Sequence, residues 1–323
     1  MRKTKSDKGI PAPLKAAAAS AGGLTAAAIL NRWLAVRAQQ ACPPIGSVIT
    51  VNRVPVHYIA RGDGPAVVLI HGSGSLVQDF TTSGLVDRLA RSHRVLAFDR
   101  PGYGYTERPR GIDWTPEEQA RLLVAACAQL GVERPLVVGH SWGTLVALAW
   151  ALDHPDRIGK LALLSGYYYK TPRPDAALMA LMGSPALGDA IVHTVAPLQA
   201  RLTGPLGVKH IFSPNSPTDT FVDEMSFGLM LRPKQLLATA RDSGQMPVAA
   251  GRLSRRYGEL RLPMTIVWGD GDKLVKQGDH SAKLAVHLPH ASAIELEGVG
   301  HMVHHVAPAK VASVIETLDA SSN

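Results

Sequence analysis

Ser141 has the sequence context of a catalytic nucleophile. It is the middle residue of G-H-S-W-G, between the apolar run 136–138 and an apolar stretch that follows Gly143. The first run predicts a buried strand and the second a packed helix, so Ser141 falls in a sharp turn between them. Gly139 and Gly143 leave room for the helix to start close to the strand. A serine placed there can attack a carbonyl carbon if a neighbouring base takes its proton.

Two more chemically active side chains follow predicted strands. Asp272 lies just after the strand 264–268, and His301 follows the strand 293–296. Carboxyl ends of parallel strands meet at one edge of a sheet, so we expect both residues near Ser141. His301 is the predicted base and Asp272 the acid that orients it. Asp270, in the same G-D-G-D run, remains the alternative acid.

The elements that must position these residues alternate between strands and helices. We predict strands at 47–51, 54–60, 66–70, 94–98, 136–138, 158–164, 264–268 and 293–296, with a tight hairpin turn at 52–53. Helices are predicted after Thr115, after Gly143, and at 278–288 and 308–319. This alternation predicts an α/β fold with a doubly wound, mostly parallel sheet.

The predicted organisation has three parts. Residues 1–42 form a basic tail and an apolar helix, and residues 43–165 with 262–323 form the α/β core. Between them, at 166–261, strand signals vanish and prolines separate short apolar helical stretches at 176–182, 187–195, 221–231 and 233–241. We predict a helical cap there.

Four motifs make the chain similar to a known family. They are H-G-S-G at 71–74, D-R-P-G-Y-G at 99–104, G-H-S-W-G at 139–143, and W-G-D-G-D at 268–272 with G-H at 300–301. Over about residues 45–320 the sequence resembles serine hydrolases of the α/β-hydrolase fold with a helical cap, the esterase and lipase-like group. The order of Ser141, Asp272 and His301 along the chain is also that of the family.

The resemblance implies a mechanism. It selects Asp272 as the acid, and it implies an oxyanion hole formed by the backbone N–H groups of Ser73 and Trp142. Haloalkane dehalogenases and many epoxide hydrolases of this fold use aspartate at the elbow. A serine at position 141 points instead to acyl transfer through an acyl-enzyme.

The substrate is less closely defined. The predicted cap is rich in Leu, Met, Ala and Pro, and its aromatic residues predict an apolar cleft over the serine: Tyr167, Tyr168, Tyr169 and Phe227. We expect a small hydrophobic acyl substrate. A prolyl aminopeptidase-like enzyme and a carbon–carbon bond hydrolase of the same fold are alternatives. A relative that binds ligands without catalysis is the alternative of another class, although all three candidate catalytic residues are present.

Neither a metal nor a cofactor is predicted. His301 and His305 are spaced as a metal pair could be, but no H-E-x-x-H motif or third ligand accompanies them. We therefore expect His304 and His305 at the surface or behind the catalytic residues. The glycines near positions 72 and 102 belong to no nucleotide-binding motif.

Four other polar residues have structural interpretations. His71 and His140 are expected to shape the backbone around the oxyanion hole rather than to transfer protons. Asp99 and Arg100, which are adjacent in the chain, are expected to form an ion pair or a turn.

Composition excludes some classes of function. The chain has 323 residues, 46% of them hydrophobic and 19% charged, which is typical of a folded globular protein. Its net charge is +8, and part of that excess lies in the tail, at Arg2, Lys3, Lys5, Lys8 and Lys15. No basic stripe with interleaved aromatic residues occurs, so nucleic acid is not a predicted partner. The two cysteines indicate no disulfide framework.

The N-terminal segment predicts contact with a membrane. Residues 16–30 carry no charge and follow the basic tail. A membrane anchor within residues 16–36, an amphipathic or merely alanine-rich helix, and a cleaved signal sequence are all open. The localisation is therefore predicted as membrane-associated through an N-terminal anchor, or cytoplasmic. Nothing in the sequence indicates an oligomeric state.

Overall fold

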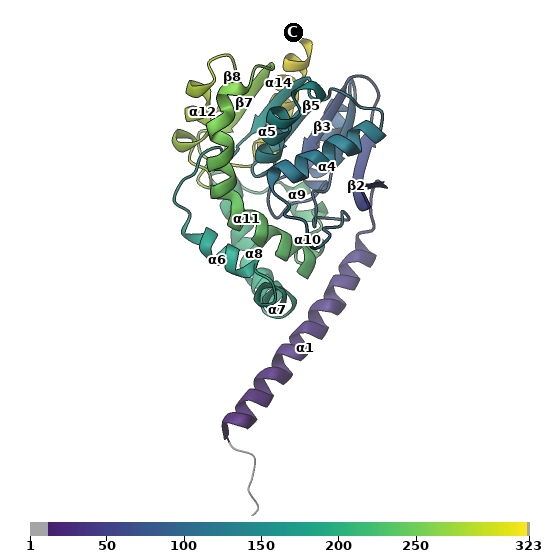
Figure 1. Ribbon diagram of the computed structural model, residues 1–323, viewed down its shortest axis with the longest axis vertical. Helices are drawn as coiled ribbons and strands as arrows, with labels where there is room; N and C mark the ends of the chain where they lie inside the picture. Colours follow the sequence, from purple (N-terminus) through teal and green to yellow (C-terminus); the bar gives the residue numbers. More distant parts are fainter. Residues whose placement is uncertain (1–11, 322–323) are drawn as a thin grey trace, which may run out of the picture.

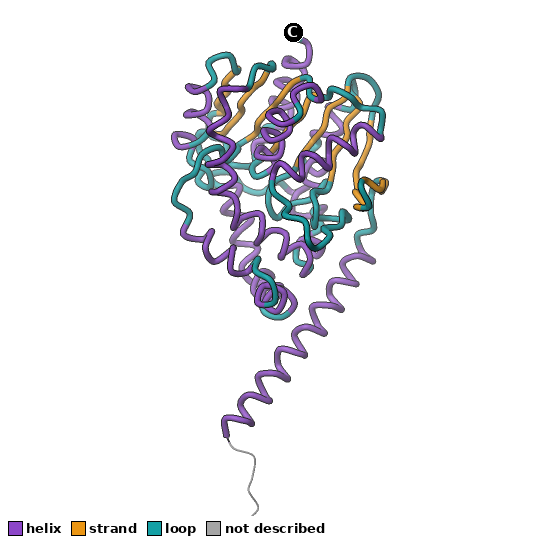
Figure 2. Tube along the Cα trace, viewed as in Figure 1, coloured by secondary structure: helices purple, strands orange, loops and turns teal. Residues whose placement is uncertain are grey.

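A sheet of eight strands forms the centre of the protein. The computed structural model describes residues 12–321, and the strand order is β1-β2-β4-β3-β5-β6-β7-β8. Figure 2 shows the strands side by side with helices in front of them and behind them. The strands are β1 (Ser47–Val51), β2 (Val54–Arg61), β3 (Ala66–Ile70), β4 (Arg94–Phe98), β5 (Leu136–His140), β6 (Lys160–Leu164), β7 (Met264–Gly269) and β8 (Ser292–Leu296).

The helices lie before the first strand, between the strands and after the last strand (Figure 1). They are α1 (Ala12–Ala41), α2 (Gln78–Thr82), α3 (Leu85–Leu89), α4 (Pro116–Gln129), α5 (Gly143–Asp153), α6 (Pro174–Met182), α7 (Leu187–His193), α8 (Ala196–Phe212), α9 (Asp219–Glu224), α10 (Phe227–Met230), α11 (Pro233–Leu253), α12 (Ser281–His287), α13 (Val303–Val306) and α14 (Pro308–Ala320).

The pairing confirms the predicted mostly parallel sheet. β1 and β2 form an antiparallel hairpin, β2 pairs antiparallel with β4, and all later neighbours are parallel. The hairpin turns at Asn52 and Arg53, whose φ angles are 49° and 67°. Positive φ at both central residues gives the turn the twist that matches its strands.

Each face of the sheet is buried under its own layer of helices. Val137 on β5 packs with residues of α4, α5 and α12 on one face. Val138, the next residue, packs with residues of α3 and α14 on the other. Neighbouring strand residues point to opposite faces, and both faces are buried. The strands therefore have continuous apolar sequences.

Residues 166–261 between β6 and β7, here called the insertion, contain α6 to α11. Figure 1 shows these helices largely at one end of the sheet, with α11 running back towards the core. Two helices of the insertion with prolines in their interior differ from the prediction. Helix α8, with Pro205 in its interior, was not expected, and α11 continues through Pro247 to Leu253 instead of ending at Arg241. Proline disfavours a helix interior, so local propensity alone argued against both.

Helix α1 contacts the insertion through its C-terminal half. The Asn31 side chain is buried and donates hydrogen bonds to the backbone carbonyls of His193 and Thr194, at 3.0 and 2.6 Å. Ala38 lies against Gly228, where an added Cβ would be 2.9 Å from the Ala38 Cβ. Figure 1 shows the N-terminal half of α1 extending away from the other elements.

Among residues 12–321, no single helix has both the length and the hydropathy needed to cross a membrane. The bent pair α6 and α7, with an angle of 89° between its helices, passes the same test of length and composition.

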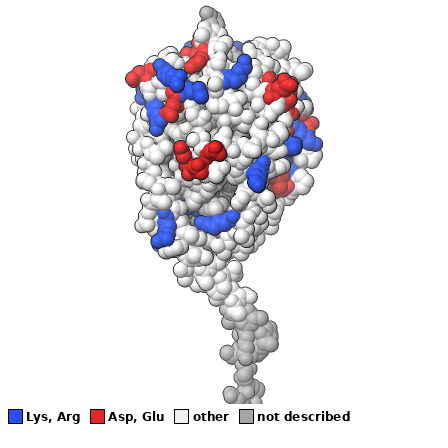
Figure 3. Space-filling model, turned by 180° about the vertical axis from the view of Figure 1, so that it is seen from behind, with Lys and Arg blue, Asp and Glu red and all other residues white. Residues whose placement is uncertain are grey.

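Charged side chains of both signs are distributed over the surface. On the face shown in Figure 3, Lys and Arg are interspersed with Asp and Glu, and no single basic patch dominates. This distribution agrees with a solvated surface as the interpretation of the positive net charge.

The loop that follows β6 is held by a buried, uncharged histidine. The backbone N–H groups of Tyr168 and Tyr169 both lie within hydrogen-bonding distance of His280 Nδ1, at 3.1 and 3.3 Å. An imidazole nitrogen can accept these bonds only while it is unprotonated. Burial lowers the pKa of His280 from 6.5 to about 4, which keeps the ring neutral near pH 7.

We therefore expect acid to destabilise the fold through His280. Because its pKa is lower in the folded than in the unfolded chain, its contribution is complete above the unfolded value of 6.5 and is lost as the pH falls towards 4. The loss is at most about 3 kcal/mol. In His280→Asn an amide oxygen takes over the acceptor role without titrating. Urea unfolding at pH 7 and at low pH should show a smaller loss of unfolding free energy on acidification for this variant than for the wild type. An equal loss in both proteins would contradict the assignment.

Candidate active site

Ser141 lies in a strained turn between β5 and α5. Its φ is 51°, which makes Ser141 one of few non-glycine residues in the left-handed region among residues 12–321. The turn brings α5 very close to the sheet, because a Cβ added to Gly143 would lie 2.3 Å from the Ile70 carbonyl oxygen. A Cβ added to Gly139 would lie 2.7 Å from the Gly143 oxygen. The sequence-based placement of Ser141 between strand and helix agrees with this geometry.

The tight approach at Gly143 should be measurable. Gly143→Ala is expected to destabilise the protein by about 1–3 kcal/mol, because its methyl group would collide with fixed backbone oxygens. Gly204→Ala in α8 is the matched control, since nothing lies within 4 Å of the added Cβ. Urea unfolding of both variants tests this; equal stabilities would show that the turn can relax.

His301 and Asp272 are in direct contact. His301 Nδ1 lies 2.7 Å from Asp272 Oδ2, and both side chains are buried. The other carboxylate oxygen, Oδ1, accepts backbone hydrogen bonds from Leu274 and Val275, each at 2.9 Å. These bonds fix the carboxylate, which in turn fixes the ring so that Nε2 is the nitrogen left to act as a base.

Asp270, the alternative acid, points elsewhere. Its Oδ1 accepts a hydrogen bond of 2.7 Å from the backbone N–H of Gly298, and the residue is exposed. This carboxylate supports the turn before His301. The geometry therefore favours Asp272 as the partner of His301.

Ser141 and His301 line one cavity of about 190 Å³. Within residues 12–321, no direct hydrogen bond joins the Ser141 hydroxyl to the His301 ring. Catalytic hydrogen bonds are often long in the absence of substrate and shorten when it binds. The structure thus brings the two side chains to the same space, with His301 already oriented by Asp272.

Ser73 and Trp142 border this cavity as well. In the described part of the chain, neither backbone N–H donates to a protein acceptor. The loop that carries Ser73 passes next to Ser141, since a Cβ added to Gly72 would lie 3.1 Å from the Ser141 Cβ. Two backbone donors are therefore available where negative charge would develop during attack by Ser141.

Arg100 holds the loop before Ser73 in place. Its guanidinium donates to the carbonyl oxygens of His71 and Gly72, at 2.9 and 3.0 Å, and to Asp242 Oδ2 on α11 at 2.6 Å. The same group stacks on the Trp142 ring, 4.3 Å from its centroid. Arg100 thus connects both candidate oxyanion donors to the insertion.

Of the two arrangements expected for Asp99 and Arg100, the turn is present, since the Tyr103 N–H donates to the Arg100 carbonyl oxygen at 2.9 Å, whereas the ion pair between them is wrong. Asp99 instead pairs with His57, with 2.6 Å between Oδ2 and Nδ1, and Arg100 pairs with Asp242. Adjacent residues at the end of an extended strand point in opposite directions, so the two side chains enter different layers.

His71 and His140 contact backbone groups, as expected. His71 Nδ1 lies 2.8 Å from the Gly72 oxygen, and its Nε2 accepts a bond from the Arg100 backbone N–H at 3.0 Å. Burial lowers the pKa of His71 to about 4. His140 Nε2 lies 3.2 Å from the His301 carbonyl oxygen. Both rings therefore position the loops that carry the candidate catalytic groups.

His304 and His305 are not at the surface, which corrects one of the two expected placements. Both are buried, and both Nε2 atoms approach Asp79 on α2. Burial alone would raise the pKa of Asp79, but His304 and His305 hold it well below its usual range. Nothing in the sequence signals this contact, because Asp79 lies 226 positions before His305.

The cavity wall is largely apolar. The insertion and nearby loops contribute Tyr167, Ile211, Phe221, Met225, Met230 and Met246, and the loops around His301 contribute Leu274, Val275 and Met302. Of the aromatic residues expected over the serine, only Tyr167 reaches the cavity among the residues that line it. Tyr168 and Tyr169 pack into the core instead, beside Tyr257.

Several known proteins are similar to this chain in sequence and in fold. The alpha/beta hydrolase fold family matches residues 65–308. Haloalkane dehalogenase 2 of Mycobacterium tuberculosis (strain ATCC 25618 / H37Rv) is 26% identical over 282 residues, which cover 82% of this chain and 91% of that protein. The 2-hydroxy-6-oxononadienedioate/2-hydroxy-6-oxononatrienedioate hydrolase of Comamonas testosteroni is 26% identical over 255 residues, covering 76% and 84%.

A solved structure gives the same result for the fold. A thermophilic esterase from Thermogutta terrifontis matches with a TM-score of 0.68 and 18% identity, covering 84% of this chain and 96% of that one. Three observations agree on the fold family: the strand order, the positive φ of Ser141 directly after β5, and the match over residues 65–308. The chain belongs to the alpha/beta hydrolase fold family.

Proposed function

We propose that this protein is a serine hydrolase that cleaves a carboxylic ester, or a related acyl bond, of a small hydrophobic substrate. The observation that carries the proposal is the convergence of three groups. Ser141 sits at a positive-φ turn, and it shares a cavity with a His301 ring that is fixed by Asp272. Family members bind many substrates, so the proposal rests on this site rather than on the fold.

The reaction has two halves. His301 Nε2 takes the Ser141 proton as Oγ attacks the carbonyl carbon, and the backbone N–H groups of Ser73 and Trp142 hold the resulting oxyanion. The protonated ring then gives its proton to the leaving alcohol as the carbon–oxygen bond breaks. Water, deprotonated by His301, attacks the acyl-enzyme, and His301 returns that proton to Ser141 Oγ as the acid is released. Asp272 stabilises the imidazolium in both halves.

The residue at the elbow argues against dehalogenation. The family's dehalogenases use a carboxylate there to displace halide, whereas this chain has the hydroxyl of Ser141. A hydroxyl activated by histidine is suited to acyl transfer.

The cavity favours a short acyl group. Its volume of about 190 Å³ is below the roughly 300–1,000 Å³ typical of sites for drug-sized ligands. Four methionines border it, Met225, Met230, Met246 and Met302, and flexible thioether chains adapt to irregular apolar groups. We propose that the insertion acts as a cap that closes this space.

A fluorophosphonate probe tests the chemistry. The folded chain should form one covalent adduct, located on Ser141 by peptide mass spectrometry, and Ser141→Ala should form none. p-Nitrophenyl butyrate should then be hydrolysed with a higher kcat/KM than the dodecanoate. A folded wild-type chain without an adduct would favour the alternative of a non-catalytic ligand-binding protein.

A carbon–carbon bond hydrolase is the second candidate. The name of the Comamonas relative describes a dicarboxylate substrate, and Arg173 lines the cavity, with its guanidinium paired to Asp175. A guanidinium can exchange one carboxylate partner for another, so Arg173 is the candidate contact for a substrate carboxylate. If this candidate holds, Arg173→Gln should lower kcat/KM for such a dienedioate while leaving butyrate ester hydrolysis unchanged.

We further propose that α1 associates with a membrane surface. Leu24, Ile29 and Trp33 are exposed on it, and Lys-rich sequence precedes it. Apolar side chains with nearby lysines bind anionic lipid interfaces. When vesicles of phosphatidylserine and phosphatidylcholine are sedimented, the full chain should be found in the vesicle pellet. A chain that lacks residues 1–41 should stay in the supernatant. Equal behaviour would remove this proposal.

A further inference from the structure

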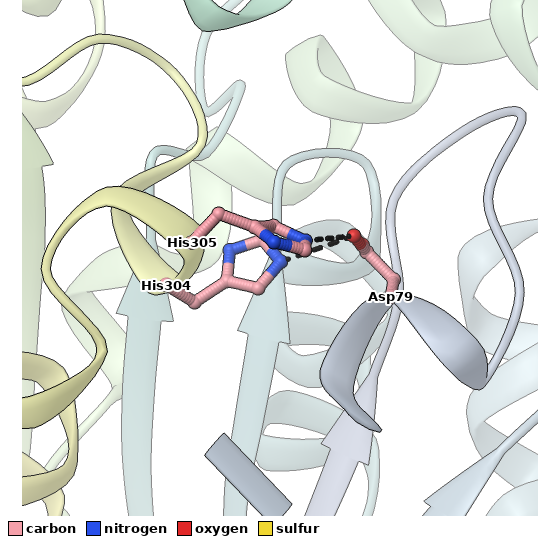
Figure 4. A group of neighbouring side chains, drawn as sticks. All are labelled: Asp79, His304 and His305. Carbon is pink, nitrogen blue, oxygen red and sulfur yellow. Dashed lines mark hydrogen bonds and ion pairs between the residues drawn. The ribbon is translucent and has the colours of Figure 1, made fainter. Parts of the chain in front are cut away.

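A buried cluster beside the candidate active site has the composition of a metal site. Figure 4 shows His304 and His305 on one side and Asp79 on the other, with the imidazole rings directed at the carboxylate. The three residues come from α13 and α2, and they are at most 4% exposed. One ligand atom from each lies within 4.8 Å of the others.

Hydrogen bonds among the described residues do not use all of these atoms. His305 Nε2 lies at hydrogen-bonding distance from Asp79 Oδ1, 2.8 Å. His304 Nε2 lies 3.2 Å from the same oxygen, yet it makes no aligned hydrogen bond there. Asp79 Oδ2 and His304 Nδ1 also have no hydrogen-bond partner in this part of the chain. Buried polar atoms without partners cost about 1–3 kcal/mol each, so this arrangement calls for a further bonded group.

His140 adds a nitrogen to the same space. With its Nε2 proton directed to the His301 carbonyl oxygen, 3.2 Å away, its Nδ1 presents a lone pair. That Nδ1 lies 3.9 Å from Asp79 Oδ2 and has no hydrogen-bond partner among residues 12–321. A lone pair facing a carboxylate is repulsive unless positive charge lies between them.

We propose that Asp79, His304 and His305 bind one divalent transition metal ion of the Zn²⁺ class, with His140 Nδ1 next to the fourth position. Two imidazole nitrogens and a carboxylate oxygen are ligands that Zn²⁺ accepts, whereas Mg²⁺ and Ca²⁺ prefer sites made of oxygen. Bonding to the ion would use His304 Nε2, the nitrogen that faces Asp79 without an aligned hydrogen bond. It would also neutralise the buried Asp79 carboxylate.

The ion would lie behind the candidate catalytic residues. Asp79 and His140 both line the cavity that contains Ser141, and His140 contacts the His301 backbone. The ion would join α2 to α13, which follows His301 in the chain. We assign it a structural role in holding that loop, which is independent of the proposed acyl transfer.

Zinc uptake by the full chain, prepared without a histidine tag and treated with a chelator, tests this site. Isothermal titration with ZnCl₂ should give one ion per chain, and the melting temperature should rise with zinc but not with MgCl₂. Co²⁺ should give the visible absorption bands of a low-symmetry nitrogen and oxygen site. These readouts do not depend on hydrolysis, so failure here leaves the serine hydrolase proposal intact.

Variants separate this site from adventitious binding. Asp79→Asn and His304→Asn should each weaken zinc binding at least about 10-fold. His57→Asn removes a different buried histidine–aspartate contact, at Asp99, and should leave the affinity unchanged. Because a variant could fail to fold, uptake by the wild type decides first. No uptake, or weak uptake that is equal in Asp79→Asn and His57→Asn, would overturn the proposal.

Discussion

Replacement of Ser141 by alanine is expected to lower kcat for p-nitrophenyl butyrate by about 10⁶-fold, with little change in stability. The reason is that alanine removes the attacking oxygen, while the backbone donors of Ser73 and Trp142 remain. The remaining rate is measured at high enzyme concentration from the absorbance of the p-nitrophenol that is released. The melting temperature of the variant confirms that it folds.

The pair of neighbouring aspartates supplies a matched control. Asp272→Asn should lower kcat by about 10⁴-fold, since the amide no longer holds the His301 tautomer. Asp270→Asn, two positions earlier, should retain nearly wild-type kcat, because the Asp270 carboxylate accepts a hydrogen bond only from the Gly298 backbone among the described residues. Adding Asp272→Asn to Ser141→Ala should cost little more than Ser141→Ala alone. A larger loss from Asp270→Asn would reassign the acid.

Asp242→Asn is expected to destabilise the protein by about 3–5 kcal/mol, the largest stability effect that we predict. The Asp242 carboxylate is fully buried and accepts bonds from Arg100 at 2.6 Å, Arg108 at 3.0 Å and the Tyr103 hydroxyl at 3.0 Å. Replacing it by a neutral amide leaves two guanidinium groups without their anion in the interior. Urea unfolding at pH 7 measures the change in the free energy of unfolding.

A second contact between the core and α11 provides the comparison. Arg252 on α11 and Glu117 on α4 form a bidentate ion pair at 2.8 and 2.7 Å, but it is partly exposed to solvent. Glu117→Gln should cost no more than about 1 kcal/mol. If Asp242→Asn and Glu117→Gln had equal effects, burial would not be the source of the stability at Asp242.

Much of the fold could be predicted because its signals are local. The apolar strands, the turn at Asn52 and Arg53 and the glycines around Ser141 each depend on neighbouring residues. The order of Ser141, Asp272 and His301 agrees with the contact seen between the last two. Helix α8 was missed because its interior Pro205 lowers helix propensity.

The contacts that could not be predicted join distant parts of the chain. Asp242 lies 142 positions after Arg100, and His305 lies 226 positions after Asp79. Spacing reveals partners on one helix or strand, but not partners that meet only when the sheet is complete. For this reason the histidines beside His301 were interpreted without their carboxylate.

The position of Trp142 limits how substrate can enter. Its indole nitrogen donates to the Asp242 carbonyl oxygen on α11 at 3.0 Å, and Trp142 also lines the cavity. Lifting α11 would pull on the residue directly after the nucleophile. We therefore expect α11 to stay fixed during turnover and the entrance to open between α8 and α9, which supply Ile211 and Phe221 to the cavity wall.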